Sequence, residues 1–210
     1  MGFDKLLADL AGRPVLRWSV EALAAAPSVG SVVVVASGET ARLVESWRGE
    51  PGMGKISAVA PGGAERHLSV LNGLRAAPAG TTHVAVHDAA RPMVRPEAVA
   101  AVVEAALSCG AAVLARPLAD TVKRATPGDE PWIAESVDRA NLWAMETPQA
   151  ARLDWLRAAL EAVVASGGHV TDEVSALQSA GHPVRLVRST APNLKITWPE
   201  DIAMAERLLG

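Results

Sequence analysis

An aspartate that directly follows a short apolar run is the first candidate for chemistry in this chain. Residues 84–92 read VAVHDAARP, and the run Val84–Val86 predicts a buried parallel strand. Asp88 would then lie just beyond the carboxyl end of that strand, where ligands bind in open α/β sheets. A carboxylate at that position can hold a divalent metal, and the small Ala89 and Ala90 would let a ligand approach the backbone.

A glycine pair at the end of another predicted strand is the second candidate. Residues 62–69 read GGAERHLS and lead into a predicted helix. Glycines let the backbone approach a planar or anionic ligand, and the helix start offers free N–H groups. An equally good explanation is a tight strand-to-helix turn, in which the glycines are needed only for the backbone conformation.

Three further segments carry charges or hydroxyls, and each also has a purely structural explanation. Residues 120–124 (DTVKR) and 137–139 (VDR) place cations on a predicted hairpin, which could equally be a solvated face. Residues 171–173 (TDE) resemble a helix N-cap with acids in the first turn. The lysine in residues 193–197 (NLKIT) could face a phosphate or point to water.

Strand-like and helix-like segments alternate around these candidates, which predicts an α/β fold: a three-layer sandwich with a mostly parallel sheet. The expected strands are residues 31–36, 56–60, 84–86, 111–115 and 184–187. The expected helices are residues 14–25, 40–47, 65–76, 96–108, 153–165, 172–180 and a last one opened by residues 199–201.

The alternation breaks at Leu118. From there to residue 149 we expect extended pieces at 121–125, 133–138 and 142–145, with a turn at 127–129 (PGD). A hairpin of this size is not stable alone. We therefore expect a β-arm that projects from a single domain of residues 1–210 and packs on a second subunit.

Composition excludes several classes of protein. Half of the 210 residues are hydrophobic, and the net charge of −3 argues against electrostatic binding of nucleic acid. No apolar run reaches membrane-spanning length, and the single Cys109 suits a reducing cytoplasm. No G-x-G-x-x-G follows a predicted strand, which argues against a dinucleotide oxidoreductase.

Taken in order and spacing, these motifs resemble the bacterial and plastid 2-C-methyl-D-erythritol 4-phosphate cytidylyltransferases over nearly the whole chain. HDAARP alone is shared with related sugar-phosphate cytidylyltransferases, whereas VDR, TPQ and NLKIT make the resemblance specific. The motifs that carry it are GGAERHLSVLNGL (62–74), HDAARP (87–92), DTVKR (120–124), VDR (137–139), TPQ (147–149), TDE (171–173) and NLKITWPED (193–201).

The resemblance implies a Rossmann-like nucleotidyltransferase that acts as a homodimer, with a β-arm from each subunit reaching the other. Such enzymes transfer CMP from CTP to the phosphate of methylerythritol phosphate, in non-mevalonate isoprenoid precursor synthesis. The products are the cytidyl diphosphate and pyrophosphate, and the cofactor is Mg²⁺. The implied location is the cytoplasm.

The resemblance also implies roles for individual residues. Positions matching the cytosine end of the CTP site are Gly63, Ala64 and Ser69, and those beside the ribose and the metal are Asp88 and Ala89. Positions matching the methylerythritol phosphate site are Arg91, Thr121, Arg139, Thr147 and Thr171. The two matching catalytic lysines are Lys5 and Lys195.

Two lysines suit this chemistry. A phosphate monoester has a second pKa of about 6, so the acceptor is already a dianionic nucleophile at neutral pH. Repulsion between that dianion and the triphosphate is the obstacle, and fixed positive charge offsets it.

The sequence departs from the family at its start. The family begins with a strand and a glycine-rich loop ahead of the first catalytic lysine, and Met1-Gly2 matches the end of that loop. We expect the native protein to extend upstream of Met1, and we expect the 210-residue form to have weak or no CTP turnover.

Two alternatives remain open from the sequence. One is a cytidylyltransferase for another polyol phosphate, such as ribitol 5-phosphate. The other is a truncated, non-catalytic dimeric scaffold.

Overall fold

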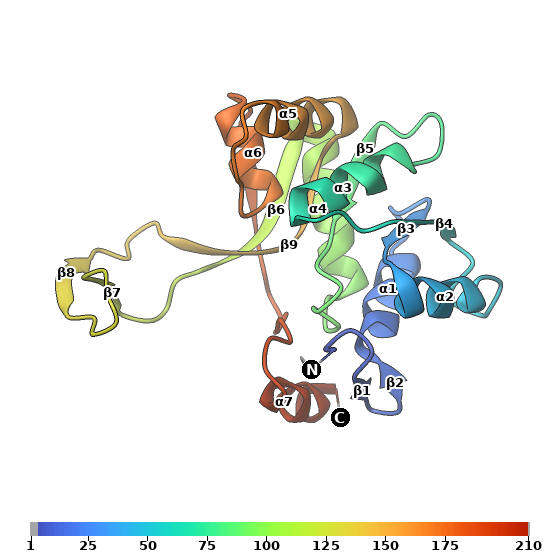
Figure 1. The fold of residues 1–210 in the computed structure, drawn as a ribbon, viewed down its shortest axis with the longest axis horizontal. Coiled ribbons are helices and arrows are strands. Elements are labelled where there is room, and N and C mark those ends of the chain that lie inside the picture. Colours follow the sequence, from blue (N-terminus) through green and yellow to red (C-terminus); the bar gives the residue numbers. More distant parts are fainter. Residues whose placement is uncertain (1–3, 210) are drawn as a thin grey trace.

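The computed structural model describes residues 4–209, which form an α/β body with one long projection (Figure 1). The strands are β1 Asp9–Leu10, β2 Arg13–Pro14, β3 Val32–Val35, β4 Ile56–Ala60, β5 His83–Val86, β6 Ala111–Pro117, β7 Val122–Ala125, β8 Ile133–Val137, β9 Trp143–Arg152 and β10 Arg185–Arg188. The helices are α1 Val15–Ala25, α2 Gly38–Trp47, α3 Arg66–Arg75, α4 Pro96–Cys109, α5 Leu153–Ala165, α6 Glu173–Ser179 and α7 Glu200–Leu209.

The main sheet has four strands in the order β10–β6–β9–β5. β6 and β10 are parallel, whereas β9 runs antiparallel to both of its neighbours. The α/β class is therefore confirmed, and the sheet is mixed. The expected extended piece at 142–145 is the start of a ten-residue strand that crosses the sheet between β5 and β6.

Helices cover both faces of this sheet, as expected for a three-layer arrangement. Side chains of α3, α5 and α6 pack with Ala111 and Ala151 on one face. Side chains of α4 pack with Ala112, Leu114 and Ala150 on the other. Neighbouring residues of one strand face opposite layers, which is the period of two that a strand imposes.

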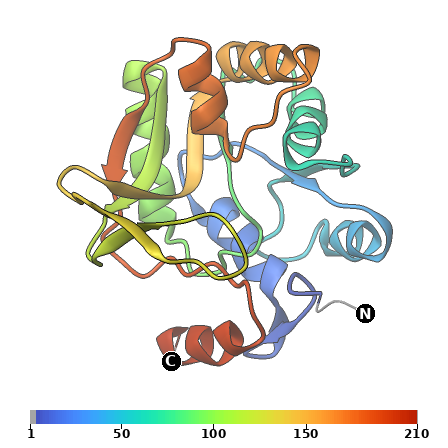
Figure 2. The same cartoon turned by 60° about the vertical axis from the view of Figure 1, so that its left-hand side comes forward.

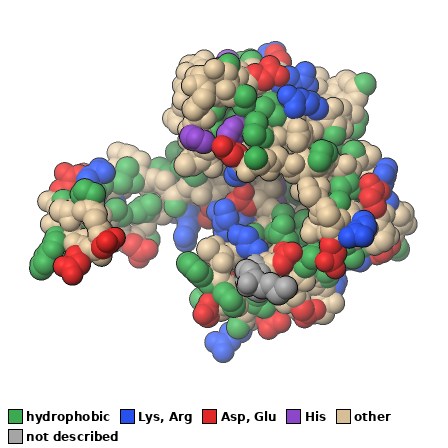
Figure 3. Space-filling view, viewed as in Figure 1, with side chains coloured by type: hydrophobic (Ala, Val, Ile, Leu, Met, Phe, Trp, Pro, Cys, Tyr) green, Lys and Arg blue, Asp and Glu red, His purple; other side chains and the backbone are tan. Residues whose placement is uncertain are grey.

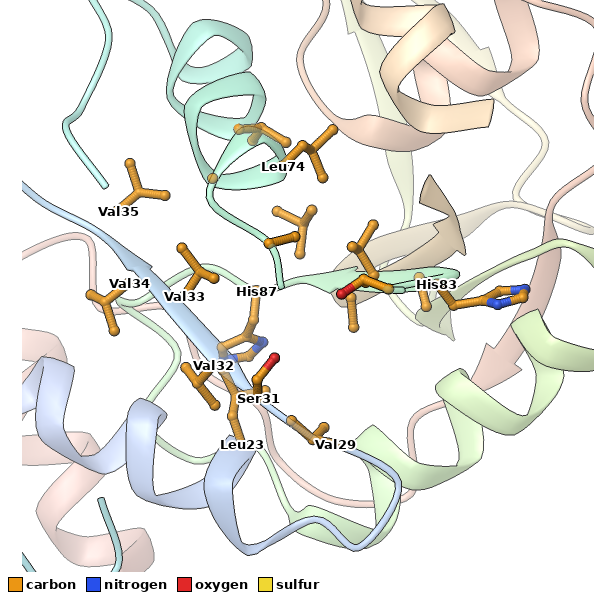
Figure 4. Close-up of a pocket in the computed structure, with 18 of the residues that line it drawn as sticks. Leu23, Val29, Ser31, Val32, Val33, Val34, Val35, Leu74, His83 and His87 are labelled. Carbon is orange, nitrogen blue, oxygen red and sulfur yellow. The ribbon is translucent and has the colours of Figure 1, made fainter. Parts of the chain in front are cut away.

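β3 and β4 form a separate parallel pair with α1 and α2 beside it. Among residues 4–209, no ladder of hydrogen bonds joins this pair to the main sheet. A cavity of about 610 Å³ lies between β3 and β5 (Figure 4).

The projection is the expected β-arm. β7 and β8 pair antiparallel around the turn that contains Gly128, whose φ is +123°. Figure 2 shows this hairpin in front of the body. The arm is shorter than the expected 118–149, because residues 143–149 already belong to β9 of the main sheet.

The chain ends close to the sheet edge that carries Asp88. Leu10, Val15, Ala90, Ile196 and Ala205 form one buried cluster. The Ile196 backbone N–H donates to the Ala90 carbonyl oxygen at 2.7 Å. This contact places residues 193–197 beside the turn that follows β5.

Candidate functional site

Asp88 lies beyond the carboxyl end of β5, as expected, and three cations surround it. Lys195 Nζ is 2.9 Å from Asp88 Oδ2, Arg66 Nη2 is 3.3 Å from Oδ1, and Arg91 Nε is 3.6 Å from Oδ2. Figure 3 shows Lys and Arg side chains gathered near the centre of one face of the molecule. Three fixed positive charges around one carboxylate make a site suited to polyanionic ligands.

These cations decide the charge state of Asp88, whose side chain is only 14% exposed. Burial alone would raise the pKa of this carboxyl. The hydrogen bond from Lys195, together with the charges of Lys195, Arg66 and Arg91, outweighs burial and holds the pKa below its ordinary value. Asp88 is therefore ionised across the neutral pH range.

A chain of hydrogen bonds behind Asp88 fixes its backbone. The Asp88 N–H donates to Thr147 Oγ1 at 3.0 Å, and Thr147 Oγ1 lies 3.0 Å from His87 Nδ1. His87 Nε2 lies 3.1 Å from the Arg91 carbonyl oxygen, which can only accept. His87 must therefore carry its proton on Nε2, and Nδ1 accepts from the Thr147 hydroxyl.

This arrangement predicts a pH dependence of stability. Burial lowers the pKa of His87 to about 4, from an ordinary value of 6.5. Because the unfolded chain binds the proton first, the contribution of His87 is lost as pH falls from about 6.5 to about 4. The expected loss is about 3 kcal/mol in the free energy of unfolding. Urea unfolding across this pH window measures it.

The matched variants are His87→Gln and His83→Gln: His83 is the first residue of β5, and His87 directly follows its last residue. His87→Gln removes the titrating ring and should flatten the pH dependence, whereas His83→Gln should leave it unchanged. An equally steep loss in the His87→Gln protein would contradict the assignment.

A buried glutamate holds one of the three cations. Glu173 is 1% exposed, and its carboxylate oxygens lie 2.5 and 2.9 Å from the Arg66 guanidinium nitrogens. Burial raises the pKa of Glu173 even though Arg66 opposes this. Arg66 thus lies between two carboxylates, those of Glu173 and Asp88.

The segment around Glu173 is fixed by two further contacts. Asp172 is the N-cap of α6, and its Oδ1 accepts from the Ser175 N–H at 2.9 Å, as the helix-cap interpretation of residues 171–173 predicts. Gln149 donates to Asp172 and accepts from the Val174 N–H. The TPQ and TDE segments therefore position each other.

The glycine pair forms a tight turn ahead of α3. The N–H groups of Gly62 and Gly63 donate to the hydroxyls of Ser37 and Ser69 at 3.0 and 2.9 Å. A Cβ on Gly63 would come within 2.6 Å of Leu68 Cβ and 2.9 Å of backbone. Close packing therefore explains Gly63 here, and Ser69 positions the turn by accepting its N–H.

Apart from Lys5, the residues suggested by the sequence fall into three groups in space. Five of them gather at the end of β5: Asp88, Ala89, Arg91, Thr147 and Lys195. Four lie around the starts of α3 and α6: Gly63 and Ala64 in the turn ahead of α3, Ser69 within α3, and the exposed Thr171 just ahead of α6. Two lie exposed on the arm, which projects away from the body: Thr121 and Arg139.

Lys5 lies half-buried in the turn ahead of β1. Its neighbour Leu6 packs against the clusters that contain Ala89 and Ala90. This stretch is therefore close to the loop that carries Asp88. Met1 and Gly2, which match the end of the family's glycine-rich loop, lie outside the described residues.

Sequence reasoning missed several residues of this site. Arg66 and Glu173 were not singled out as a pair, although both stand inside motifs that were. The Asn193 amide donates to Glu146 Oε2 at 3.1 Å and to the Thr147 carbonyl oxygen at 2.9 Å. The asparagine two residues before Lys195 thereby fixes the NLKIT segment, and its place at the head of that motif was the only signal for it.

Within residues 4–209, no group of three or more His, Cys, Asp or Glu side chains could hold a metal ion. Asp88 is the only carboxylate among the clustered site residues, and cations already contact both of its oxygens. Mg²⁺ is commonly held by one or two carboxylates together with substrate phosphates, so Asp88 fits a metal that arrives with a nucleotide. In the same part of the chain, no helix is long and apolar enough to span a membrane.

A family profile described as "2-C-methyl-D-erythritol 4-phosphate cytidylyltransferase" matches residues 1–210. A protein of that name from Pelotomaculum thermopropionicum is 40% identical over 202 residues, which are 96% of this chain and 84% of the relative. A "Bifunctional enzyme IspD/IspF" from Desulforudis audaxviator is 46% identical over 207 residues, and the chain spans about half the length of such bifunctional relatives. The crystal structure of the Thermus thermophilus cytidylyltransferase is similar with a TM-score of 0.80 at 33% identity, covering 98% of this chain and 93% of that one.

Proposed function

The chain belongs to the 2-C-methyl-D-erythritol 4-phosphate cytidylyltransferase family, and we propose that it transfers CMP from CTP to 2-C-methyl-D-erythritol 4-phosphate. The reaction releases pyrophosphate and belongs to non-mevalonate isoprenoid precursor synthesis. The observation that carries the proposal is the ionised Asp88 at the end of β5, ringed by Lys195, Arg66 and Arg91.

The chain's own residues support this reaction through charge and position. An oxygen of the acceptor phosphate attacks the α-phosphorus of CTP, and the bond between the α-phosphorus and the bridging oxygen breaks. Negative charge builds on the phosphoryl oxygens and the leaving pyrophosphate. Lys195, held at 2.9 Å from Asp88, and Lys5 are the cations we assign to that charge.

We propose Mg²⁺ as the cofactor, held by Asp88 together with phosphate oxygens of CTP. When bound, the metal neutralises phosphate charge. Asp88 is suited to this because its low pKa keeps it ionised. The turn of Gly63 and Ala64, together with Ser69 of α3, would receive the cytosine. Backbone groups of this turn can recognise the edge of the base.

The choice of acceptor distinguishes this proposal from its nearest alternative, a cytidylyltransferase for another polyol phosphate. We expect pyrophosphate release from CTP to depend on 2-C-methyl-D-erythritol 4-phosphate and to be at least a hundredfold slower with ribitol 5-phosphate. Equal rates would favour a broader polyol phosphate cytidylyltransferase. Calorimetric titration of CTP with Mg²⁺ that detects no binding to the protein would favour the non-catalytic scaffold.

We propose that two copies of the chain pair through the arm, so that Thr121 and Arg139 serve the acceptor site of the partner subunit. Exposed apolar side chains near the arm's turn support this: Trp132 is 75% exposed and Ile133 is 72% exposed. Large exposed apolar side chains on a narrow hairpin are typical of an interface.

Truncating these arm side chains should weaken the dimer. For Trp132→Ala with Ile133→Ala, we expect a dimer dissociation constant raised about 10- to 100-fold, because buried Trp residues dominate interface energies. Trp198→Ala, at a tryptophan 67% exposed beyond the arm, is the matched control and should leave the constant unchanged. Analytical ultracentrifugation makes the comparison, and equal behaviour of the two proteins would remove the arm from the interface.

A cytoplasmic location and a single domain of residues 1–210 complete the proposal. Cys109, the one cysteine, has its thiol within 3.0 Å of the Ala105 carbonyl oxygen. A lone structural thiol is compatible with a reducing compartment.

A further inference from the structure

Glu146 is a buried carboxylate to which the proposed function gives no role. It lies on β9, directly before Thr147, and is only 6% exposed. Figure 1 shows β9 running from the arm into the body. Glu146 Oε1 lies 3.5 Å from Nε of Arg116, whose side chain is largely exposed, and Oε2 accepts from the Asn193 amide at 3.1 Å. Burying a carboxylate is costly unless it is paired and hydrogen-bonded, and Glu146 has both kinds of partner.

Asn193 connects the segments that meet around Asp88. Its side-chain amide also donates to the Thr147 carbonyl oxygen at 2.9 Å, and its own carbonyl oxygen accepts from Arg91 Nη1 at 2.8 Å. Thr147 Oγ1 accepts from the Asp88 backbone N–H, and Arg91 Nε lies 3.6 Å from the Asp88 carboxylate. These four residues therefore form a closed ring of contacts. Asn193 is the member of the ring that belongs to the segment of Lys195.

Glu146 completes the hydrogen bonding of the Asn193 amide. Carboxylate and carbonyl oxygens can only accept, so the contacts with Glu146 and Thr147 engage the two hydrogens of the amide nitrogen. Asn193 is 8% exposed, and a buried N–H that loses its acceptor destabilises the arrangement around it. Without the carboxylate of Glu146, only one of these two hydrogen bonds would remain to hold the amide in place.

Lys195 lies between two anchors of its segment. Asn193 is the first, and Ile196 is the second. The Ile196 side chain is fully buried, and the Ile196 N–H donates to the Ala90 carbonyl oxygen. The Lys195 side chain is itself 44% exposed, and within residues 4–209 its ion-pair partner is Asp88. The position of the lysine ammonium therefore depends on the backbone between residues 193 and 196.

We propose that Glu146 is a positioning residue for cytidylyl transfer: by accepting from Asn193, it holds the backbone that carries Lys195. The ammonium of this lysine thereby stays against Asp88. Glu146 acts through its acceptor oxygen and not through its charge. The effect on turnover rests on the proposed function, whereas the fixed position of residues 193–196 does not.

Two substitutions of Glu146 separate its hydrogen bond from its charge, with pyrophosphate release as the readout. Glu146→Ala removes the acceptor and should lower kcat about 10- to 100-fold, because a displacement of about 1 Å in a catalytic array can cost that much. KM for CTP should change less than about threefold. Glu146→Gln keeps an acceptor oxygen and should stay within about threefold of the unsubstituted protein. Equal losses for alanine and glutamine would assign the effect to charge and overturn the proposal. Glu104→Ala, which removes an exposed carboxylate of α4, is the control and should leave kcat unchanged.

A second background shows whether the effect passes through Lys195. The Lys195→Ala protein has no ammonium left to position, so adding Glu146→Ala to it should lower kcat by less than about a further threefold. An additional loss of about tenfold or more in this background would mean that Glu146 serves another group, and the proposal would fail.

Hydrogen exchange tests the hold on this segment without substrate. In Glu146→Ala, the Ile196 backbone amide should exchange at least about tenfold faster than in the unsubstituted protein, and in Glu146→Gln its exchange should not change. The amides of β3 should exchange equally in all three proteins, which excludes a general loss of stability. Unchanged exchange of the Ile196 amide in Glu146→Ala would overturn the proposal. An unsubstituted protein that transfers no CMP would contradict the proposed reaction, and exchange would still decide whether Glu146 holds the segment.

Discussion

Lys195→Ala is expected to lower kcat of cytidylyl transfer by about 10²- to 10³-fold, the cost typical of removing one preorganised group that stabilises transition-state charge. Lys195 is held against Asp88 at 2.9 Å while its side chain stays 44% exposed. Its ammonium therefore combines a fixed position with access to a ligand. Pyrophosphate release from CTP in the presence of 2-C-methyl-D-erythritol 4-phosphate measures the effect.

Lys55→Ala is the matched control for this experiment. Lys55 also loses one positive charge on substitution, but its ammonium donates to the Ala26 carbonyl oxygen at 2.8 Å, outside the site. We expect its turnover within threefold of the unsubstituted chain. The stability of Lys195→Ala should change little, because Arg66 and Arg91 still accompany Asp88. Turnover of Lys195→Ala within threefold of the starting protein would remove Lys195 from the chemistry.

Elements with strong local patterns were predictable from the sequence. The strand at 56–60 and the helix at 153–165 have the expected bounds, because each is a short-range hydrophobic pattern with clear ends. The arm was also predictable, since Pro127-Gly128-Asp129 has the residues that a turn requires.

The path of β9 was not predictable in the same way. Nothing in the sequence of residues Trp143 to Arg152 indicates that this strand runs antiparallel to its neighbours. Its place between β5 and β6 follows from pairing with residues far away in the sequence. The cavity between β3 and β5 likewise depends on how strands far apart in the sequence are arranged. Local periodicity identifies strands, but it does not say which edges meet.

The site shows the same division. The position of Asp88 beyond the end of β5 was predictable, because the apolar run Val84–Val86 predicts the strand and Asp88 follows it closely in the sequence. The Arg66–Glu173 pair joins residues 107 positions apart, and neither helix pattern points to the other. The charged residues at the starts of both helices were visible in the sequence. Only the folded structure shows that Arg66 and Glu173 form an ion pair.

The Arg66–Glu173 pair provides the second large prediction. Burial raises the pKa of Glu173 despite the facing guanidinium, so ionising this carboxyl in the folded state is costly. Buried ion pairs can often be replaced by apolar residues of similar volume at little cost in stability. We therefore expect this pair to act chiefly by positioning Arg66 against Asp88, 3.3 Å away.

Glu173→Gln should lower kcat of cytidylyl transfer about 10- to 100-fold, because a displacement of about 1 Å in a catalytic array can cost that much. It should also destabilise the fold, since Arg66 loses its buried partner. The double variant Arg66→Met with Glu173→Met removes both charges and should recover most of the stability. Urea unfolding and pyrophosphate release are measured on both proteins.

Stability and turnover of the double variant together distinguish a structural role of the pair from a positioning role. If the pair only stabilises the fold, activity should return with stability in the double variant. If it positions Asp88, the double variant should be stable yet still at least tenfold slower, because nothing then braces the carboxylate on the Oδ1 side. Arg48→Met with Glu45→Met is the control, since that exposed pair lies at the end of α2 with its charged groups 3.1 Å apart and contains no site residue. Recovery of full activity in the Arg66→Met, Glu173→Met protein would reduce the pair to a structural contact.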